Sequence, residues 1–188
     1  MVVTMQRVFS RLEERLNEDE PRHEAELRDV LADVLRDVFG LTRRDVRTEH
    51  RVGTKLVDVW IEPLHVAIEL KYHRPIPSGR SRPMTQQFGD LLSDVGKLVR
   101  VAEAQQRFLV LLSDAAGVTH VQNKYLLPTR EVGPKRITRS DIARLAESAR
   151  TRVEGQGAWQ EVSVALFWQT TLRHALNGLA WDVKPTPG

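Results

Sequence analysis

The chain has 188 residues, of which 41% are hydrophobic and 28% are charged, a composition typical of one globular domain with a full core over residues 1–188. The absence of cysteine excludes disulfides and thiolate metal sites, and it agrees with a reducing, cytoplasmic environment. A net charge of +3 and a pI near 9.5 favour a polyanionic partner, and no apolar stretch approaches the roughly 20 residues that cross a bilayer.

Two helices are expected before the first strand, over residues 5–16 and about 20–39. In the second helix, apolar residues recur at three- and four-residue spacing from Leu27 onward, and Gly40 follows as a C-terminal cap. Glu24 lies one turn before Leu27, at the edge of the stripe that this spacing predicts to be buried. The helix dipole alone also favours an acid in the first turn, so this position does not by itself imply a role.

Three short runs of β-forming residues follow, at 45–52, 56–61 and 66–72. A glycine-containing turn joins the first run to the second, and a four-residue loop interrupted by Pro63 joins the second to the third. The last two runs therefore predict a β-hairpin. Glu49, on the polar side of the first run, could join acids of the second if these strands are neighbours.

The predicted hairpin brings two acids together. If Ile61 pairs with Val66, the antiparallel register places Asp58 opposite Glu69, with their Cβ atoms roughly 5 Å apart. Two carboxylates that close in an apolar sheet require a proton or a cation between them. Lys71 follows two residues after Glu69, so it points to the same face. The pattern indicates a metal site, although alternate charged residues also form the solvated outer face of many strands.

The loop after this strand is basic. Its sequence from residue 71 to 82 is KYHRPIPSGRSR, and no acid occurs between Glu69 and Asp90. Prolines and a glycine predict irregular structure. Arg74, Arg80 and Arg82 are candidates for contacts with nucleic-acid phosphates, while a solvated connection is the alternative.

A long amphipathic helix is expected over about residues 84–105, and a continuous apolar run at 107–112 predicts a buried strand. A right-handed crossover through the helix would place that strand parallel to the one at 66–72. Together these elements predict an α/β fold with a mixed β-sheet flanked by helices.

Asp58, ten intervening residues and then Glu69-Leu70-Lys71 at the end of an apolar run resemble the core motif of the PD-(D/E)xK nuclease superfamily. Val57 stands where that motif has its proline, the letter that members most often lack. The resemblance covers about residues 20–113 and implies a restriction-endonuclease-like core.

The resemblance also implies roles for individual residues. Asp58, Glu69 and the Leu70 carbonyl would bind Mg²⁺, with Mn²⁺ as a substitute, and Lys71 would assist the attacking water. Glu24 matches the glutamate that reaches the metal from the first core helix, although Glu20 and Glu26 compete for this assignment. Gln87 matches a glutamine near the catalytic residues, with Gln86 as the alternative.

Residues 114–184 are expected to elaborate the core. A basic connection with proline and glycine at 128–140 leads into a helix expected from about 141 to 153, then a strand near 161–168. A helical turn and a short strand are expected within 171–184. The many basic residues in the connection and helix make a second candidate nucleic-acid surface, or an ordinary charged helix face.

The function predicted from these patterns is a metal-dependent nuclease, with DNA as the first substrate and endonuclease as the expected mode. A non-catalytic nucleic-acid-binding or scaffold protein with the same fold is the alternative from another class, and an RNA nuclease is a third possibility. A chain of this size is expected to have no separate recognition domain, so specificity would come from its own loops, from a homodimer or from a partner protein.

Overall fold

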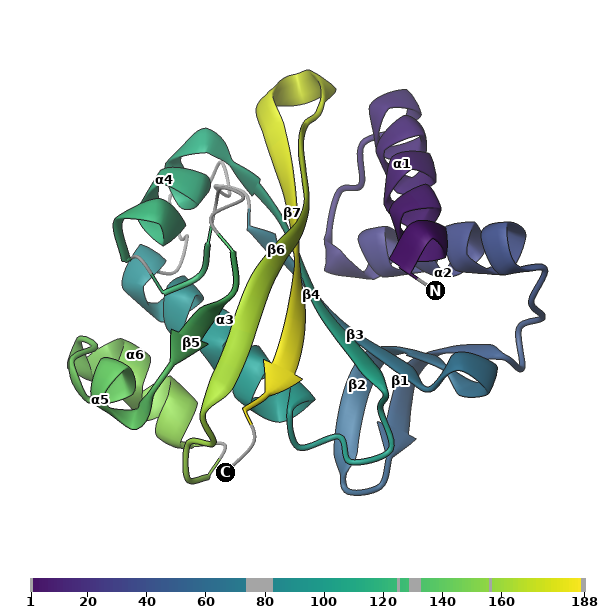
Figure 1. The fold of residues 1–188 in the computed structure, drawn as a ribbon. Helices are drawn as coiled ribbons and strands as arrows, with labels where there is room; N and C mark the ends of the chain where they lie inside the picture. Colours follow the sequence, from purple (N-terminus) through teal and green to yellow (C-terminus); the bar gives the residue numbers. More distant parts are fainter. Residues whose placement is uncertain (1, 74–82, 125, 129–132, 156, 187–188) are drawn as a thin grey trace.

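In a computed structural model, the chain is described over residues 2–73, 83–124, 126–128, 133–155 and 157–186. These residues form an α/β protein with a seven-stranded mixed sheet and six α-helices (Figure 1). The sheet order is β1-β2-β3-β4-β7-β6-β5. The strands are β1 (Val46–Val52), β2 (Lys55–Ile61), β3 (Val66–His73), β4 (Gln106–Asp114), β5 (Lys135–Ile137), β6 (Val162–Thr171) and β7 (Leu176–Pro185). The helices are α1 (Val2–Glu18), α2 (Glu24–Phe39), α3 (Met84–Leu98), α4 (Ala115–Lys124), α5 (Arg139–Ala143) and α6 (Glu147–Glu154).

The predicted hairpin of β2 and β3 is present in the predicted register. Ile61 pairs with Val66, and the ladder continues antiparallel to Val59 and Ile68. The connecting residues Glu62–Leu64 form one 3₁₀ turn that ends at His65, whose φ of 50° is left-handed. On the other side of β2, β1 is antiparallel as well. Three successive strands of the chain are therefore neighbours in the sheet.

Helix α3 connects β3 to β4, and the two strands pair in parallel as the crossover predicted. The helix ends at Leu98, before the expected end near residue 105. The buried guanidinium of Arg107 accounts for part of this early end: its Nε donates to Leu98 O at 2.9 Å and its Nη2 to Val101 O at 2.8 Å. These bonds stabilise carbonyls that no further helical turn covers.

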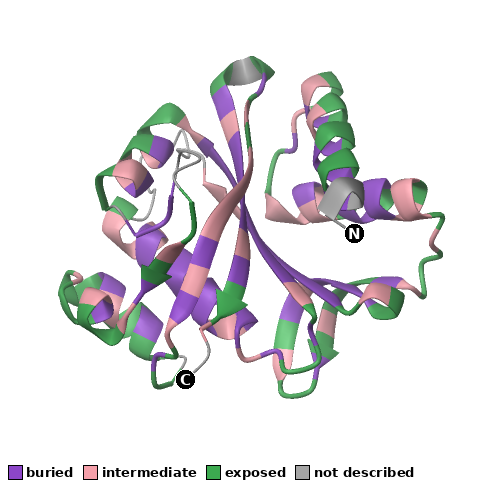
Figure 2. Ribbon diagram, viewed as in Figure 1, coloured by how far each residue is buried: buried purple, intermediate pink, exposed green. Residues whose placement is uncertain are grey.

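Each face of the sheet has its own apolar core, and Figure 2 marks the buried residues along the strands and helices. Helices α1 and α2 cover one face, and α3 to α6 lie on the other (Figure 1). Strand β4 contributes to both cores, because its side chains alternate between the two faces. The core under α1 and α2 contains Phe108, Val110 and Leu112, and the core under α3 contains Leu109 and Leu111. A strand that is apolar on both sides must lie inside the sheet.

The C-terminal part differs from the prediction in three places. Residues 115–124 form α4, which no pattern had indicated. The single helix expected at 141–153 is two helices, because the chain turns between Ala143 and Glu147. The short strand expected near the end is the ten-residue β7, which lies between β4 and β6 and pairs antiparallel with both. The elaboration therefore continues the same sheet.

The described helices include none that combines the length and apolarity needed to cross a membrane.

Candidate active site

The predicted acids meet where β2 and β3 separate. Backbone pairing ends at Val59 and Ile68. The expected ladder pair of Asp58 and Glu69 is therefore absent. Instead, the Leu70 N–H donates to Asp58 Oδ2 at 2.8 Å. The Asp58 side chain takes the donor that a backbone carbonyl would otherwise use, and the ladder stops there. The same contact fixes the Asp58 carboxylate beside the Glu69-Leu70-Lys71 segment.

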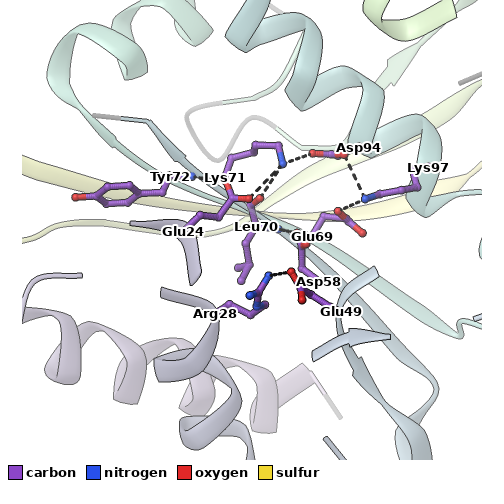
Figure 3. Close-up of polar contacts among 10 residues, drawn as sticks. All are labelled: Glu24, Arg28, Glu49, Asp58, Glu69, Leu70, Lys71, Tyr72, Asp94 and Lys97. Carbon is purple, nitrogen blue, oxygen red and sulfur yellow. Dashed lines mark hydrogen bonds and ion pairs between the residues drawn. The ribbon is translucent and has the colours of Figure 1, made fainter. Parts of the chain in front are cut away.

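Glu69 is completely buried, with 0% of its side chain exposed. Its Oε2 forms an ion pair with Lys97 Nζ, which reaches it from α3 (Figure 3). Burial raises the pKa of Glu69 well above its ordinary value, and the charges of Asp58 and Asp94 raise it further. The solvated outer face considered for this strand is therefore wrong, since Trp60 and Ala67 on the same face are also buried.

Lys71 lies among carboxylates. Its Nζ is 2.9 Å from Asp94 Oδ2 and 3.8 Å from Glu24 Oε1, and it donates to the Leu70 carbonyl at 3.1 Å. Burial lowers the pKa of Lys71, but Asp94 and Glu24 outweigh burial, and the net pKa lies above the ordinary value. Lys71 is accordingly an ammonium ion in this arrangement.

Glu24 reaches the same place from the first turn of α2. Its Oε2 accepts the Tyr72 N–H at 3.2 Å, immediately after Lys71. Burial raises the pKa of Glu24, although the Lys71 charge opposes this shift. The competing Glu26 points elsewhere, since its carboxylate accepts the Arg22 N–H at 2.6 Å at the start of the helix. Glu24, and not Glu26, therefore lies beside Lys71.

Helix α3 supplies two residues that the sequence analysis missed. Asp94 joins both lysines, because its Oδ1 is 3.5 Å from Lys97 Nζ and its Oδ2 contacts Lys71. Gln87, Asp90, Asp94 and Lys97 recur at three- and four-residue spacing, so they follow one side of the helix. This polar stripe, opposite the apolar one, was the available signal. Gln87 itself lies in the first turn of α3 and is half-buried.

We refer to Glu24, Asp58, Glu69, Lys71, Asp94 and Lys97 as the carboxylate–lysine cluster (Figure 3). Beside it, Glu49 is held by Arg28 at 2.8 Å. Glu49 interrupts β1 with a left-handed φ of 48°, and its side chain is 63% exposed. In this arrangement the Glu49 carboxylate pairs with Arg28 and with neither of the cluster's two lysines.

The cluster has donors suited to a hard divalent cation. Four carboxylates face two ammonium groups, so two negative charges are uncompensated when all six groups are ionised. Within the described residues, no three acidic or histidine side chains converge closely enough to hold a metal by themselves. The metal ligands implied by the resemblance are Asp58, Glu69, the Leu70 carbonyl and Glu24, and all four are oxygen donors of the kind Mg²⁺ prefers.

The predicted phosphate contacts of Arg74, Arg80 and Arg82 lie outside the described residues.

Comparisons with protein families, curated proteins and solved structures found no significant match to the chain.

Proposed function

We propose that this chain is a metal-dependent nuclease with a restriction-endonuclease-like core, and that it hydrolyses phosphodiester bonds in DNA. The observation that carries the proposal is the contact between Asp58 and the Leu70 N–H, which gathers Asp58, Glu69, the Leu70 carbonyl and Lys71 at one end of β3. These are the residues that the core motif of the resembled superfamily assigns to metal binding and catalysis.

The order of elements supports the same proposal. Helix α2, strands β1 to β3, helix α3 and the parallel strand β4 follow one another as the resemblance to that superfamily implies. Glu24 also supports it, because it approaches Lys71 from the expected helix.

In this proposal Asp58, Glu69 and the Leu70 carbonyl hold Mg²⁺ or Mn²⁺. When bound, the metal ion supplies Lewis-acid stabilisation of phosphate charge and a more acidic water. The Lys71 ammonium orients water and offsets negative charge on a phosphate oxygen, and Asp94 and Glu24 fix its position. The burial of Glu69 and Trp60 excludes bulk water from one side of these groups, which strengthens their electrostatic effect.

A non-catalytic protein that binds nucleic acid through the same fold is the second candidate. The observation in its favour is that lysines already pair with Glu69 and Asp94 in the described structure. Such a protein would need no divalent ion. Metal-dependent cleavage therefore distinguishes a nuclease from a non-catalytic binding protein. Digestion of DNA and RNA side by side distinguishes a DNA nuclease from an RNA nuclease.

The direct test is incubation of supercoiled plasmid with the purified protein in Mg²⁺ or Mn²⁺, beside an EDTA control and a matched RNA substrate. We expect metal-dependent nicking or linearisation, reduced roughly 10²-fold or more by Asp58→Asn and by Lys71→Met because each removes charge at the reacting phosphate. Asp33→Asn and Lys124→Met remove exposed charges of the same sign outside the cluster, and they should cleave at the wild-type rate.

The result that contradicts a catalytic role is nucleic-acid binding of equal strength in EDTA and Mg²⁺ with no cleavage under any of these conditions. Cleavage retained in both Asp58→Asn and Lys71→Met would instead show that the chemistry lies elsewhere in the chain. Light scattering of the active preparation would show whether a homodimer, the simplest means of cutting both strands, is present.

A further inference from the structure

Lys97 contacts the carboxylate that the proposed function assigns to the metal ion. Its Nζ pairs with Glu69 Oε2, and its side chain is 20% exposed whereas Glu69 is 0% exposed. The other carboxylate oxygen, Oε1, is buried and accepts no hydrogen bond from any described residue. Within that part of the chain, Lys97 is the cation in direct contact with Glu69.

A buried carboxylate is costly unless a positive charge compensates it. Lys97 supplies that charge in the arrangement described here, so it does part of what a divalent cation would do at Glu69. A divalent ion at Glu69 would repel the ammonium that already contacts this carboxylate, so each weakens the binding of the other. Their occupancy of Glu69 is consequently competitive.

Asp94 provides a second position for the ammonium. Its Oδ1 lies 3.5 Å from Lys97 Nζ, one helical turn away on α3. Because Asp94 is itself nearly buried, with a side chain 12% exposed, a cation that moves toward it remains inside the cluster. The Lys97 ammonium already contacts both carboxylates, so a shift toward Asp94 needs no change of fold.

We propose that Lys97 is an internal counter-ion that competes with the divalent cation for Glu69 and shifts to Asp94 when the cation binds. The inference rests on the proposed function, since it needs Glu69 to be a metal ligand. It assigns to Lys97 the control of metal affinity, a role distinct from that of Lys71, whose ammonium lies on Asp94 and Glu24.

The first test measures Mn²⁺ affinity of metal-free protein by calorimetry, without nucleic acid. Lys97→Met should bind Mn²⁺ on the order of tenfold more tightly, because the ion no longer displaces an ammonium from Glu69. Lys97→Arg keeps the charge and should remain near the wild-type affinity. Lys71→Met removes the same charge from the cluster without freeing Glu69, so its increase in Mn²⁺ affinity should be smaller. Lys124→Met changes an exposed lysine outside the cluster and should leave Mn²⁺ affinity unchanged.

The second test measures thermal unfolding in EDTA. Lys97→Met should lower the melting temperature by about 5 °C, because Glu69 is left buried without its partner. Adding Glu69→Gln to that variant should restore most of the loss, and saturating Mn²⁺ should restore it for Lys97→Met alone. This readout does not depend on cleavage.

Equal or weaker Mn²⁺ binding by Lys97→Met, with cleavage intact in the wild type, overturns the counter-ion role and leaves the nuclease proposal standing. Tighter binding by Lys97→Met without cleavage by any variant supports the counter-ion role and overturns the nuclease proposal. Absence of Mn²⁺ binding in every variant overturns both.

Discussion

Gly178 in β7 lies directly against the indole of Trp168 in β6. A Cβ at this position would be 2.3 Å from Trp168 Cη2 and 2.5 Å from Cζ3, closer than carbon atoms approach without displacement. The pairing of β6 with β7 shifts by one residue between Leu166 and Trp168, so the ring lies over the neighbouring strand. The glycine is needed for space, since the indole is rigid.

Gly178→Ala should therefore destabilise the protein by about 1–3 kcal/mol, because the indole or the strand must move. Urea unfolding followed by far-UV circular dichroism measures the loss. The double variant Gly178→Ala with Trp168→Phe has a smaller ring at the contact and should recover part of it. Equal stability of wild type and Gly178→Ala would show that the ring moves without cost.

At the scale of elements, the ends of helices depend on single side chains from other segments. Arg107 of β4 stabilises the carboxyl end of α3 by two hydrogen bonds while it is itself buried. Thr138 and Asp141 bond each other reciprocally at the start of α5, the arrangement of a capping box. The Arg107 bonds mark the end of α3 and the capping box marks the start of α5, at positions that the apolar pattern alone leaves ambiguous.

Arg107→Met should lower the free energy of unfolding by about 1–2 kcal/mol, since charged hydrogen bonds to the Leu98 and Val101 carbonyls are lost. Guanidinium-chloride unfolding measures this, with Arg51→Met as the matched control, because Arg51 is an exposed arginine of β1. A loss no larger than that of Arg51→Met would mean that the turn after α3 holds without the guanidinium.

The capping box should make stability depend on pH. The pKa of Asp141 lies below its ordinary value of 3.8, chiefly because the Thr138 N–H donates to its carboxylate. A depressed folded pKa means that the contribution of Asp141 is present above 3.8 and is lost as the pH falls through the folded pKa. The loss should stay below about 1 kcal/mol, because Asp141 is partly exposed and water screens its charge.

The measurement is the urea midpoint of wild type and Asp141→Asn from about pH 5 downward. The advantage of the wild type should shrink as the pH falls below 3.8. An advantage that is constant with pH would show that Asp141 acts through its shape and not through its charge.

At the scale of the molecule, local patterns predicted most of the core. Alternating and continuous apolar runs predicted β2, β3 and β4, the hairpin register from Ile61–Val66 to Val59–Ile68 and the parallel pairing of β3 with β4, since burial on one or both faces leaves a clear signal. The Asp58–Glu69 pairing failed because a side-chain bond to Leu70 replaces the ladder. Asp94 and Lys97 were missed because the polar stripe of α3 contains them but only the tertiary contacts with Glu69 and Lys71 show which of its residues join the cluster.

The position of β7 was beyond prediction for a different reason. Strands far apart in the sequence pair according to the whole topology, and no local pattern specifies which neighbour each will have. Helix α4 was missed because only Val118 and Val121 among its residues are buried, which is too short an apolar stripe to recognise. These gaps concern elements around the core and not the strands that hold the carboxylate–lysine cluster.

The central place of β7 has a consequence for synthesis of the protein. Strand β4 pairs with β3 on one edge, but its other edge stays open until residues 176–185 have been made. At ~5–20 residues per second, a nascent chain waits several seconds while residues 115–175 are added. During that interval an apolar strand has an unpaired edge, which is a template for aggregation. Folding of this sheet is therefore tied to the ribosome and to any chaperone that shields β4 as the chain emerges.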